Sequence, residues 1–521
     1  MNLNSIEQKQ LAMQEKYKKK WSMNMKIDAL INCFIEQSIK SGEIDPIDKI
    51  YLTNRLIALL GKEDFIVVQS PEITISRLDT LDQLIEYAVE TGLIEDLSSS
   101  RDILSAEIMD LITPRPSEVN HQFWETYNES PVKATNEFYE MSQNNNYIKT
   151  REIAQNIAFN YDDVDYGEIQ ITINLSKPEK DPKEIALASK FTKSTSYPAN
   201  ALVAENEGYR GNLSHPGRTN HRLIRMDLQG DQWAFQYSPY AYYKEHSIFL
   251  AMEHRPMDVG PQAIRNLLEI IRQLPHYFVG SNAGLPIVGG SILSHDHYQG
   301  GRHHFPIQDA EYSYKFEMNG APKIEAGIVK WPMSVIRLRG KKVEELAEAA
   351  ATIMEKWEGY SDNSVGIYGE TEGIPHNAIT PIARMNGDQY ELDIVLRNNL
   401  TTKDYPDGVF HPHPHVQHIK KENIGLIEVM GLAILPPRLK QELADVEAYL
   451  LDENSEIAAI HQEWADQLKK EHANITKENV RAILEAAVGK VFVEVLENAG
   501  VFKQTEEGQK AFVKFIEKML I

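Results

Sequence analysis

The chain has 521 residues, 42% of them hydrophobic and 25% charged, which is the balance of a globular protein built from roughly two to four structural units. Its formal net charge of −22 argues against non-specific binding to nucleic acid or to an anionic membrane, and it requires any phosphate site to be locally basic. No apolar run approaches membrane-spanning length, and the polar start Met1–Lys20 lacks the apolar core of a signal peptide. Cys33 is the only cysteine, which excludes an intramolecular disulfide and a Cys-based zinc site. We therefore expect a cytoplasmic protein.

The first part of the chain divides into a helical region and a mixed region. Residues 1–165 carry apolar residues at helical spacing and predict a helical N-terminal region. Residues 166–325 open with an alternating strand at Glu168–Leu175, contain a helix at Pro261–Leu274, and reach a histidine-rich strand. We expect them to form one domain.

The second part repeats this order. Residues 326–440 contain a strand at Met333–Leu338, a helix at Val343–Trp357 and a second histidine-rich segment at His411–His418, while residues 441–521 are again helical. The pattern of strands, a helix and a His-x-His segment, seen twice, indicates an internal duplication. The predicted fold class is α+β, with two mainly antiparallel halves between a helical N-terminal region and a helical C-terminal tail.

The stretch from Gly289 to Pro306 says most about function. His295, His297 and Gln299 are spaced by two, so in a strand they project from one face, and the glycine pairs around them let a ligand approach the backbone. A neutral imidazole can attack phosphorus, and a neighbouring amide can donate to a phosphoryl oxygen. This combination indicates nucleotidyl transfer through a covalent histidine intermediate; the alternative interpretation is a metal site or a surface His-x-His pair.

The run Ser294–Gln299 resembles the His-x-His-x-Gln signature of the histidine-triad superfamily. Further stretches resemble more specifically the class II galactose-1-phosphate uridylyltransferases of Gram-positive bacteria; these are Thr172–Pro182, Glu205–Tyr209, Gln236–Tyr240 with Glu245–His246, and Glu422–Gly431. The resemblance implies two histidine-triad-like halves and a homodimer. It also implies a ping-pong exchange of UMP between UDP-glucose and galactose 1-phosphate.

The resemblance also implies roles for single residues. His297 would be the nucleophile and Gln299 would contact the transferred phosphoryl group. Asn282 and Ser291 lie where the superfamily places nucleotide and phosphate contacts, with Ser294 as a competitor for Ser291. Because glutamine does not titrate, Gln299 favours a uridylyl-histidine that waits for a phosphate acceptor, and so a transferase over a hydrolase.

Two segments of the sequence carry histidines at spacings that could hold a metal. In class I relatives a zinc site uses two cysteines and two histidines; here Asn200 and Val203 stand in the cysteine positions, and His254 and His295 match the histidines. We expect no zinc there, since valine is no ligand, and we expect His295 to orient its neighbour instead. The second segment has three alternating histidines, His411, His413 and His415. They suit zinc, iron or nickel; the alternative is that they line the sugar-phosphate site. No cofactor is predicted to be required.

Basic groups for an acidic substrate gather on both sides of the histidine strand. Arg218 and Arg222 precede it and Arg302 follows it, and bidentate guanidinium contacts suit phosphate, although a surface ion pair is the alternative for each arginine. By resemblance, Lys421, Asn423 and Glu428 fall in the region that contacts the hexose.

Two rival functions remain open at the sequence level. One is another nucleotidyl enzyme of the superfamily, such as a dinucleoside-polyphosphate phosphorylase. The other is a non-catalytic protein that binds a metal through its histidines, against which the glutamine of the signature argues.

Overall fold

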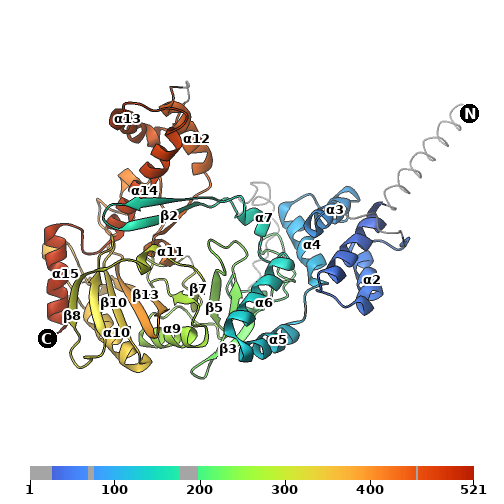
Figure 1. Ribbon diagram of the computed structural model, residues 1–521, viewed down its shortest axis with the longest axis horizontal. Helices are drawn as coiled ribbons and strands as arrows, with labels where there is room; N and C mark the ends of the chain where they lie inside the picture. The colour runs from blue at the N-terminus through green and yellow to red at the C-terminus, as the bar shows by residue number, and fades with distance from the viewer. Residues whose placement is uncertain (1–25, 68–74, 177–196, 291, 453–455, 521) are drawn as a thin grey trace, which may run out of the picture. The chain divides into compact units, whose positions relative to one another are not determined.

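The computed structural model describes residues 26–67, 75–176, 197–290, 292–452 and 456–520 (Figure 1). The described chain falls into two compact units. The first lies within Met1–Thr126, Ala134–Ile148 and Glu179–Ile224, and the second comprises Tyr127–Lys133, Lys149–Pro178 and Arg225–Ile521. Among the described residues no helix is long and apolar enough to cross a membrane.

The N-terminal region is helical, as predicted, but the first unit does not follow the predicted boundaries, because it also includes Glu179–Ile224 from the segment expected to form the next domain. Residues 26–40 are helical, and the helices that follow along the chain are α2 (Lys49–Leu59), α3 (Arg77–Glu90), α4 (Ser98–Asp110), α5 (Pro116–Glu129) and α6 (Pro131–Asn144). Helix α3 begins at a capping box in which Ser76 and Asp79 satisfy each other's backbone N–H groups. The apolar stripes predicted from the sequence form one core, with Ile31, Phe34 and Leu84 completely buried.

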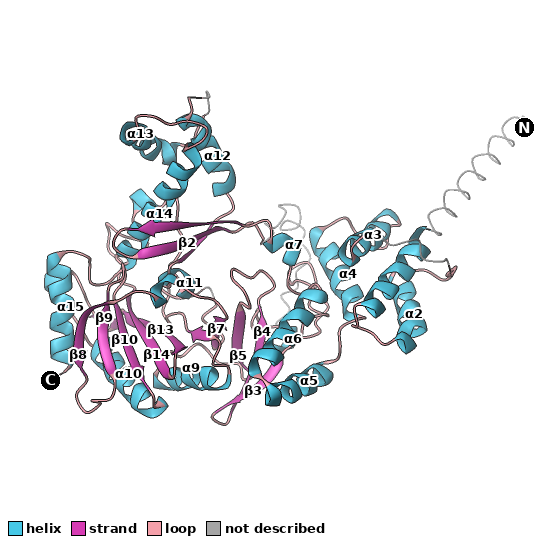
Figure 2. Cartoon of the chain, in the orientation of Figure 1, coloured by secondary structure: helices cyan, strands magenta, loops and turns pink. Residues whose placement is uncertain are grey.

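The second unit is built on a ten-stranded antiparallel sheet in the order β3-β4-β5-β7-β6-β13-β14-β10-β9-β8. The strands are β3 (Ile224–Leu228), β4 (Asp231–Tyr237), β5 (Ser247–Ala251), β6 (Phe278–Gly280), β7 (His297–Gly301), β8 (Tyr312–Glu317), β9 (Glu325–Val329), β10 (Val335–Gly340), β13 (Asn377–Asn386) and β14 (Gln389–Asn398). The helices α9 (Pro261–Gln273) and α10 (Val343–Glu358) pack against each other and against one face of this sheet (Figure 2).

The sheet shows the internal duplication in its topology. Each half has five strands ordered first, second, third, fifth, fourth, with its helix inserted between the third and fourth strands. The fourth strands, β6 and β13, pair antiparallel and join the halves into one sheet, with Gly280 opposite Ile382. The α+β class is therefore confirmed, with the halves sharing a single sheet.

The observed boundary between the halves differs from the predicted one at residues 325 and 326. Strand β8 already pairs with β9, so the second half begins before that boundary. The predicted strand at Glu168–Leu175 corresponds to β2 (Gly167–Ile173), which belongs to a separate three-stranded sheet with β1 (Ile157–Asp163) and β15 (Leu432–Leu435). Strand β15 joins β2 in parallel from more than two hundred residues away, a pairing without local sequence signal.

This small sheet, with α14 (Val480–Ala499) packed on it, lies on the other side of the large sheet from α9 and α10, whereas α15 (Glu506–Met519) packs against α10 (Figure 1). The remaining elements are α7 (Thr150–Ile153), α11 (Leu426–Val429), α12 (Leu439–Leu450), α13 (Gln462–Glu471) and the short hairpin of β11 (Glu370–Thr371) and β12 (Ile374–Pro375). The core between the layers includes Ile171, Trp331, Leu426 and Phe492. The predicted helical tail is thus confirmed.

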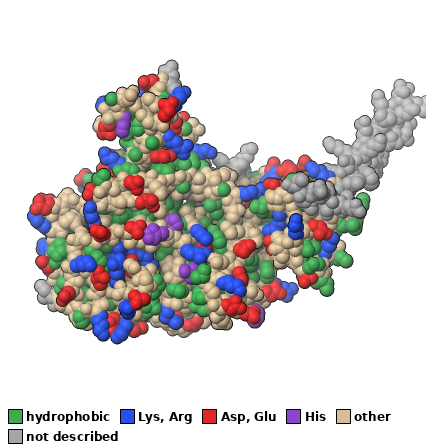
Figure 3. Space-filling view, in the orientation of Figure 1, with side chains coloured by type: hydrophobic (Ala, Val, Ile, Leu, Met, Phe, Trp, Pro, Cys, Tyr) green, Lys and Arg blue, Asp and Glu red, His purple; other side chains and the backbone are tan. Residues whose placement is uncertain are grey.

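Acidic and basic side chains are interspersed on the face seen in Figure 3. The excess of acidic groups in the composition is therefore spread among cations rather than gathered on this face.

Candidate active site

The histidine strand lies inside the large sheet, where β7 pairs with β5 on one side and β6 on the other. Tyr298 faces the helices, since its hydroxyl accepts a hydrogen bond from Asn266 of α9 at 3.1 Å. Side chains alternate along a strand, so His297 and Gln299 project from the opposite face. His297 and Gln299 therefore share one face of the strand, as predicted.

His297 is buried and its ring is fixed by the backbone. Its Nδ1 donates to the carbonyl oxygen of His295 at 2.8 Å, and this bond places the proton on Nδ1 and leaves the lone pair on Nε2. Burial lowers the pKa of His297 below its ordinary value, more than the backbone hydrogen bond raises it. The ring is therefore a neutral imidazole with a nucleophilic Nε2 near neutral pH.

His295 lies just before β7 and is almost completely buried. Its Nε2 donates to the carbonyl oxygen of Ala251 at 3.0 Å, and its ring stands perpendicular to that of His254 with centroids 5.6 Å apart. Asn200 and Val203 belong to the first unit, where the Asn200 side chain accepts from the backbone of Leu202 and Val203 is buried. His295 thus holds its neighbouring strand and presents its backbone oxygen to His297.

The helix-covered face locks the same strand in place. Asp296 accepts a hydrogen bond from Nε of Arg255 at 3.1 Å, and Arg255 lies over the ring of Trp233, which stacks on Tyr298. Burial raises the pKa of Asp296 to about 6, although Arg255 opposes the shift. Asp296 and Tyr298, which alternate with His297 and Gln299 along the chain, therefore hold the strand in position.

Gln299 has a partner that the sequence did not single out as a site residue. The Nε2 of His246 lies 3.1 Å from Oε1 of Gln299. His246 is buried, and burial lowers its pKa to about 4, so it is neutral near pH 7. The sequence signal for it was its place in Glu245–His246, a pair that resembles the family but carried no role in the site.

Arg302 is held by a buried carboxylate. Its Nε donates to Oε1 of Glu245 at 2.9 Å, and Tyr277 donates to the other oxygen at 2.7 Å. Glu245 is completely buried. The sequence left a surface ion pair open for Arg302, whereas the observed partner is the buried Glu245, 57 residues away.

Arg218 and Arg222 belong to the first unit. Arg222 is buried and donates to Asp110 at 2.8 Å and to the carbonyl oxygen of Pro114 at 2.6 Å, while Arg218 lies over the ring of Tyr147. These contacts tie the segment around residues 218–222 to the helices of that unit. Phosphate binding by these two arginines stays a prediction.

Asn282 connects the loop after β6 to α11. Its Oδ1 accepts the backbone N–H of Leu426 at 2.8 Å, and its amide nitrogen faces Gly290. Ser294 is exposed at the end of the same loop, and Ser291 lies outside the described residues.

The glycines around the histidine strand make room for the protein itself. A Cβ atom at any of the four would come closer to neighbouring protein atoms than real Cβ atoms do. From such a Cβ, the nearest atom would be the carbonyl oxygen of Ala283 at 2.3 Å for Gly289, Nδ2 of Asn282 at 2.9 Å for Gly290, the carbonyl oxygen of Phe278 at 2.7 Å for Gly300 and that of Glu245 at 2.4 Å for Gly301. Close packing of the protein around the strand is therefore sufficient to require glycine at these positions.

The segment expected to contact the hexose lies around α11. Glu428 is buried and accepts from Lys420 at 2.9 Å. Burial raises the pKa of Tyr242, whose ring contacts His246, and the charge of Glu428 raises it further. Lys421 and Asn423 are exposed. Lys420, next to the predicted Lys421, is therefore the lysine that pairs with Glu428.

The second histidine-rich segment makes separate contacts. His411 lies 3.2 Å from Oδ1 of Asn423, His413 bonds the carbonyl oxygen of Val409 at 3.0 Å, and His415 pairs with Glu494 at 2.6 Å. Within the described ranges no three His, Cys, Asp or Glu side chains come together as a metal site. The candidate metal at this segment stays a prediction.

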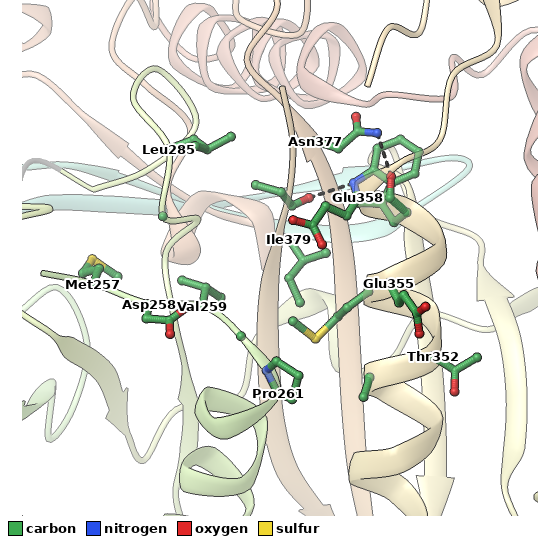
Figure 4. Close-up of a pocket in the computed structure, with 16 residues that line it drawn as sticks. Met257, Asp258, Val259, Pro261, Leu285, Thr352, Glu355, Glu358, Asn377 and Ile379 are labelled. Atoms are coloured by element: carbon green, nitrogen blue, oxygen red, sulfur yellow. Dashed lines mark hydrogen bonds between the residues drawn. The ribbon is translucent and has the colours of Figure 1, made fainter. Parts of the chain in front are cut away.

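A cavity of about 600 Å³ lies on the helix-covered side, between the start of α9, the second half of α10 and the start of β13 (Figure 4). Asp258, Glu355 and Glu358 line it, and its wall is fixed by a hydrogen bond from Asn377 to the backbone of Trp357. Three carboxylates disfavour a diphosphate, and the lining includes no residue of β7. The candidate active site is therefore the opposite face of the sheet, around His297.

Two family models match the chain. The model of the N-terminal domain of galactose-1-phosphate uridyl transferase covers residues 42–256, and the model of its C-terminal domain covers residues 269–466. The chain belongs to the galactose-1-phosphate uridylyltransferase family. As a member of this family, the protein is a nucleotidyltransferase of galactose metabolism.

Curated members of the galactose-1-phosphate uridylyltransferase family align along almost the whole chain. A protein of this name from Streptococcus pneumoniae (strain Hungary19A-6) is 54% identical over 94% of this chain and 99% of its own length. One from Latilactobacillus sakei is 55% identical over 91% of this chain and 94% of its own, and one from Streptococcus mutans is 52% identical over 94% and 99%. Among solved structures, yeast Ap4A phosphorylase Apa2 in complex with AMP aligns with a TM-score of 0.35 and 14% identity over 60% of this chain and 90% of its own.

Proposed function

We propose that the protein transfers a uridylyl group from UDP-glucose to galactose 1-phosphate through a covalent intermediate on His297. The observation that carries this proposal is the 2.8 Å hydrogen bond from Nδ1 of His297 to the backbone of His295, because it directs the lone pair of Nε2 away from the strand. The lowered pKa of the buried ring supports the same role, since only a neutral imidazole is a nucleophile.

The chemistry needs two displacements at one phosphorus. In the first, Nε2 attacks the phosphorus of the UMP moiety, a P–N bond forms, the P–O bond to the second phosphate breaks, and glucose 1-phosphate leaves with the bonding electrons. In the second, a phosphate oxygen of galactose 1-phosphate attacks, the P–N bond breaks, and its electron pair returns to Nε2. Neither displacement requires a proton transfer, which suits the non-titrating Gln299 as a donor to the phosphoryl oxygen.

The test is the intact mass of the protein after brief incubation with UDP-glucose alone. We expect one added uridylyl group, its absence in His297→Ala, and its removal by galactose 1-phosphate. His121→Gln, which changes an exposed histidine of α5, is the matched control and should keep the adduct. A His297→Ala protein that still carries the adduct would overturn the assignment, and an adduct formed from an adenine dinucleotide instead of UDP-glucose would favour the phosphorylase alternative.

The cytoplasmic location and the homodimer stay predictions, the second carried by the family resemblance alone. Light scattering on the purified protein measures its oligomeric state directly.

A further inference from the structure

His246 lies immediately before β5, and the strand brings it to the face that carries the nucleophile. Ile248 pairs with Gln299 and Leu250 with His297 across β5 and β7. Residue 246 has the same parity as 248 and 250, so its side chain leaves the sheet on the same side as His297 and Gln299. The 3.1 Å contact between His246 and Gln299 is therefore a contact within the candidate active site.

We propose that His246 is a positioning residue: by donating from Nε2 to Oε1 of Gln299, it turns the amide NH₂ of Gln299 toward the phosphoryl group that His297 receives. This inference rests on the proposed roles of His297 and Gln299 and deepens them. An amide has one donor end and one acceptor end, and a phosphoryl oxygen is stabilised only by the donor end. A group that binds the acceptor oxygen of Gln299 therefore determines whether the amide NH₂ can point to the phosphoryl group and assist the reaction.

The surroundings of His246 favour the tautomer that this role needs. Its Nδ1 is buried and has no hydrogen-bond partner among the described residues. A proton there would be a buried N–H without an acceptor, which protein interiors avoid more strictly than an unpaired acceptor. The proton therefore belongs on Nε2, where Oε1 of Gln299 receives it, and burial keeps the ring uncharged by lowering its pKa to about 4.

The ring of His246 is also held in place. It packs against Tyr243 and Tyr242 with centroids 4.6 Å and 5.3 Å away, and the hydroxyl of Tyr243 donates to the backbone of Gly300 at 3.1 Å. The backbone oxygen of His246 accepts from Ser238 at 2.7 Å. A ring held on two sides cannot follow Gln299 if the amide rotates, so the hydrogen bond constrains the glutamine rather than the histidine.

The preceding residue reinforces this constraint. Glu245 adopts a left-handed backbone conformation with φ of 56°, and its buried carboxylate is bonded by Tyr277 and Arg302. Arg302 follows β7 directly, so Glu245 and His246 contact the catalytic strand at two places, Arg302 and Gln299. The corner before β5 thus couples the position of Gln299 to the packing of the sheet.

The test compares three substitutions at position 246 in the full chain. His246→Phe keeps the ring volume without a donor, and His246→Asn has a donor too short to reach Gln299. His246→Gln places an amide nitrogen near the original Nε2. We expect the first two to slow release of glucose 1-phosphate in a single turnover by about 10-fold to 100-fold with little change in the KM for UDP-glucose, and His246→Gln to recover most of that loss.

The matched control is His121→Phe, the same substitution at an exposed histidine of α5. It should leave the single-turnover rate unchanged, and an equal loss there would overturn the proposal. The decisive readout is a double-mutant cycle with Gln299→Ala: in that background His246→Phe should cost nothing further. Additive losses, or a Gln299→Ala protein with full activity, would also overturn it.

The two proposals fail separately. A His297→Ala protein that still forms the uridylyl adduct removes the proposed mechanism. An adduct lost in His297→Ala together with additive losses in the cycle removes only the role of His246.

Discussion

The buried carboxylate of Asp393 provides a quantitative test of how the second half of the sheet is stabilised. Asp393 is completely buried on β14 and accepts from Nε and Nη2 of Arg337 at 2.6 Å and 3.0 Å, and from Nη2 of Arg384 at 2.7 Å. Arg337 lies directly opposite Asp393 on β10 and also donates to the carbonyl oxygens of Ile307 and Ala310. The cluster therefore ties the sheet to the segment that follows the catalytic strand.

Asp393→Ala removes three charge-assisted hydrogen bonds and leaves two buried guanidinium groups. Glu391 remains close to both arginines and compensates part of the charge. Breaking a buried pair by removing one partner costs about 3–5 kcal/mol, which is the expected loss in the free energy of unfolding. Although burial alone raises the pKa of Asp393, the two arginines hold it below its ordinary value. The contribution is therefore full above about pH 4 and is lost only as the pH falls through the folded pKa.

Urea denaturation followed by tryptophan fluorescence measures this loss, since Trp233, Trp331 and Trp357 are buried in the second unit. The control is Asp388→Ala, in the exposed turn between β13 and β14, which pairs with Lys341 on the surface and should leave the unfolding midpoint unchanged. An Asp393→Ala protein within about 1 kcal/mol of the parent at pH 7 would show that Glu391 alone neutralises the arginines and would refute the estimate.

Three further predictions concern the nucleophile, the packing and the metal. Because burial lowers the pKa of His297 from 6.5, the single-turnover rate with UDP-glucose should stay level as the pH falls to about 6.5 and drop only below it; a midpoint above this value would contradict a depressed pKa. Gly489→Ala places a Cβ 2.3 Å from Cβ of Tyr161, so α14 should be destabilised against β1 by about 1 kcal/mol or more despite the better helix propensity, whereas Gly359→Ala meets open space and should lose no stability in the same urea titration. Dialysis against a chelator should leave uridylyl transfer unchanged, and a stoichiometric metal whose removal abolishes turnover would contradict the absence of a required cofactor.

The parts of the fold that the sequence predicted are those with a local periodic signal. The helix predicted at Pro261–Leu274 is α9 (Pro261–Gln273), and the helix predicted at Val343–Trp357 is α10 (Val343–Glu358), because each carries one apolar stripe against the sheet. The division between the halves was placed too late because nothing in the local pattern of β8 says that it pairs with β9. Pairing partners are a tertiary property, and register is fixed only when both strands are present.

The same distinction applies to the candidate site. His297 and Gln299 were predictable because two residues of one strand suffice to define their common face. His246, Lys420 and the buried partner of Arg302 were not, since each acquires its role from a contact made by the folded chain; His246 and Gln299, for example, are 53 residues apart. The packing role of the glycines was not predictable for the same reason, because the sequence shows that a side chain is missing but not which atoms occupy the space.

The acceptor that fixes the ring of His297 is a main-chain oxygen. Every amino acid has this oxygen, so no point substitution at position 295 removes it. The residue there can therefore change its side chain during evolution, and gain or lose a ligand for a metal, without altering the tautomer of its neighbour. The backbone of the strand therefore fixes the orientation of the nucleophile, and a point mutation is less able to remove this contact than any side-chain contact in the site.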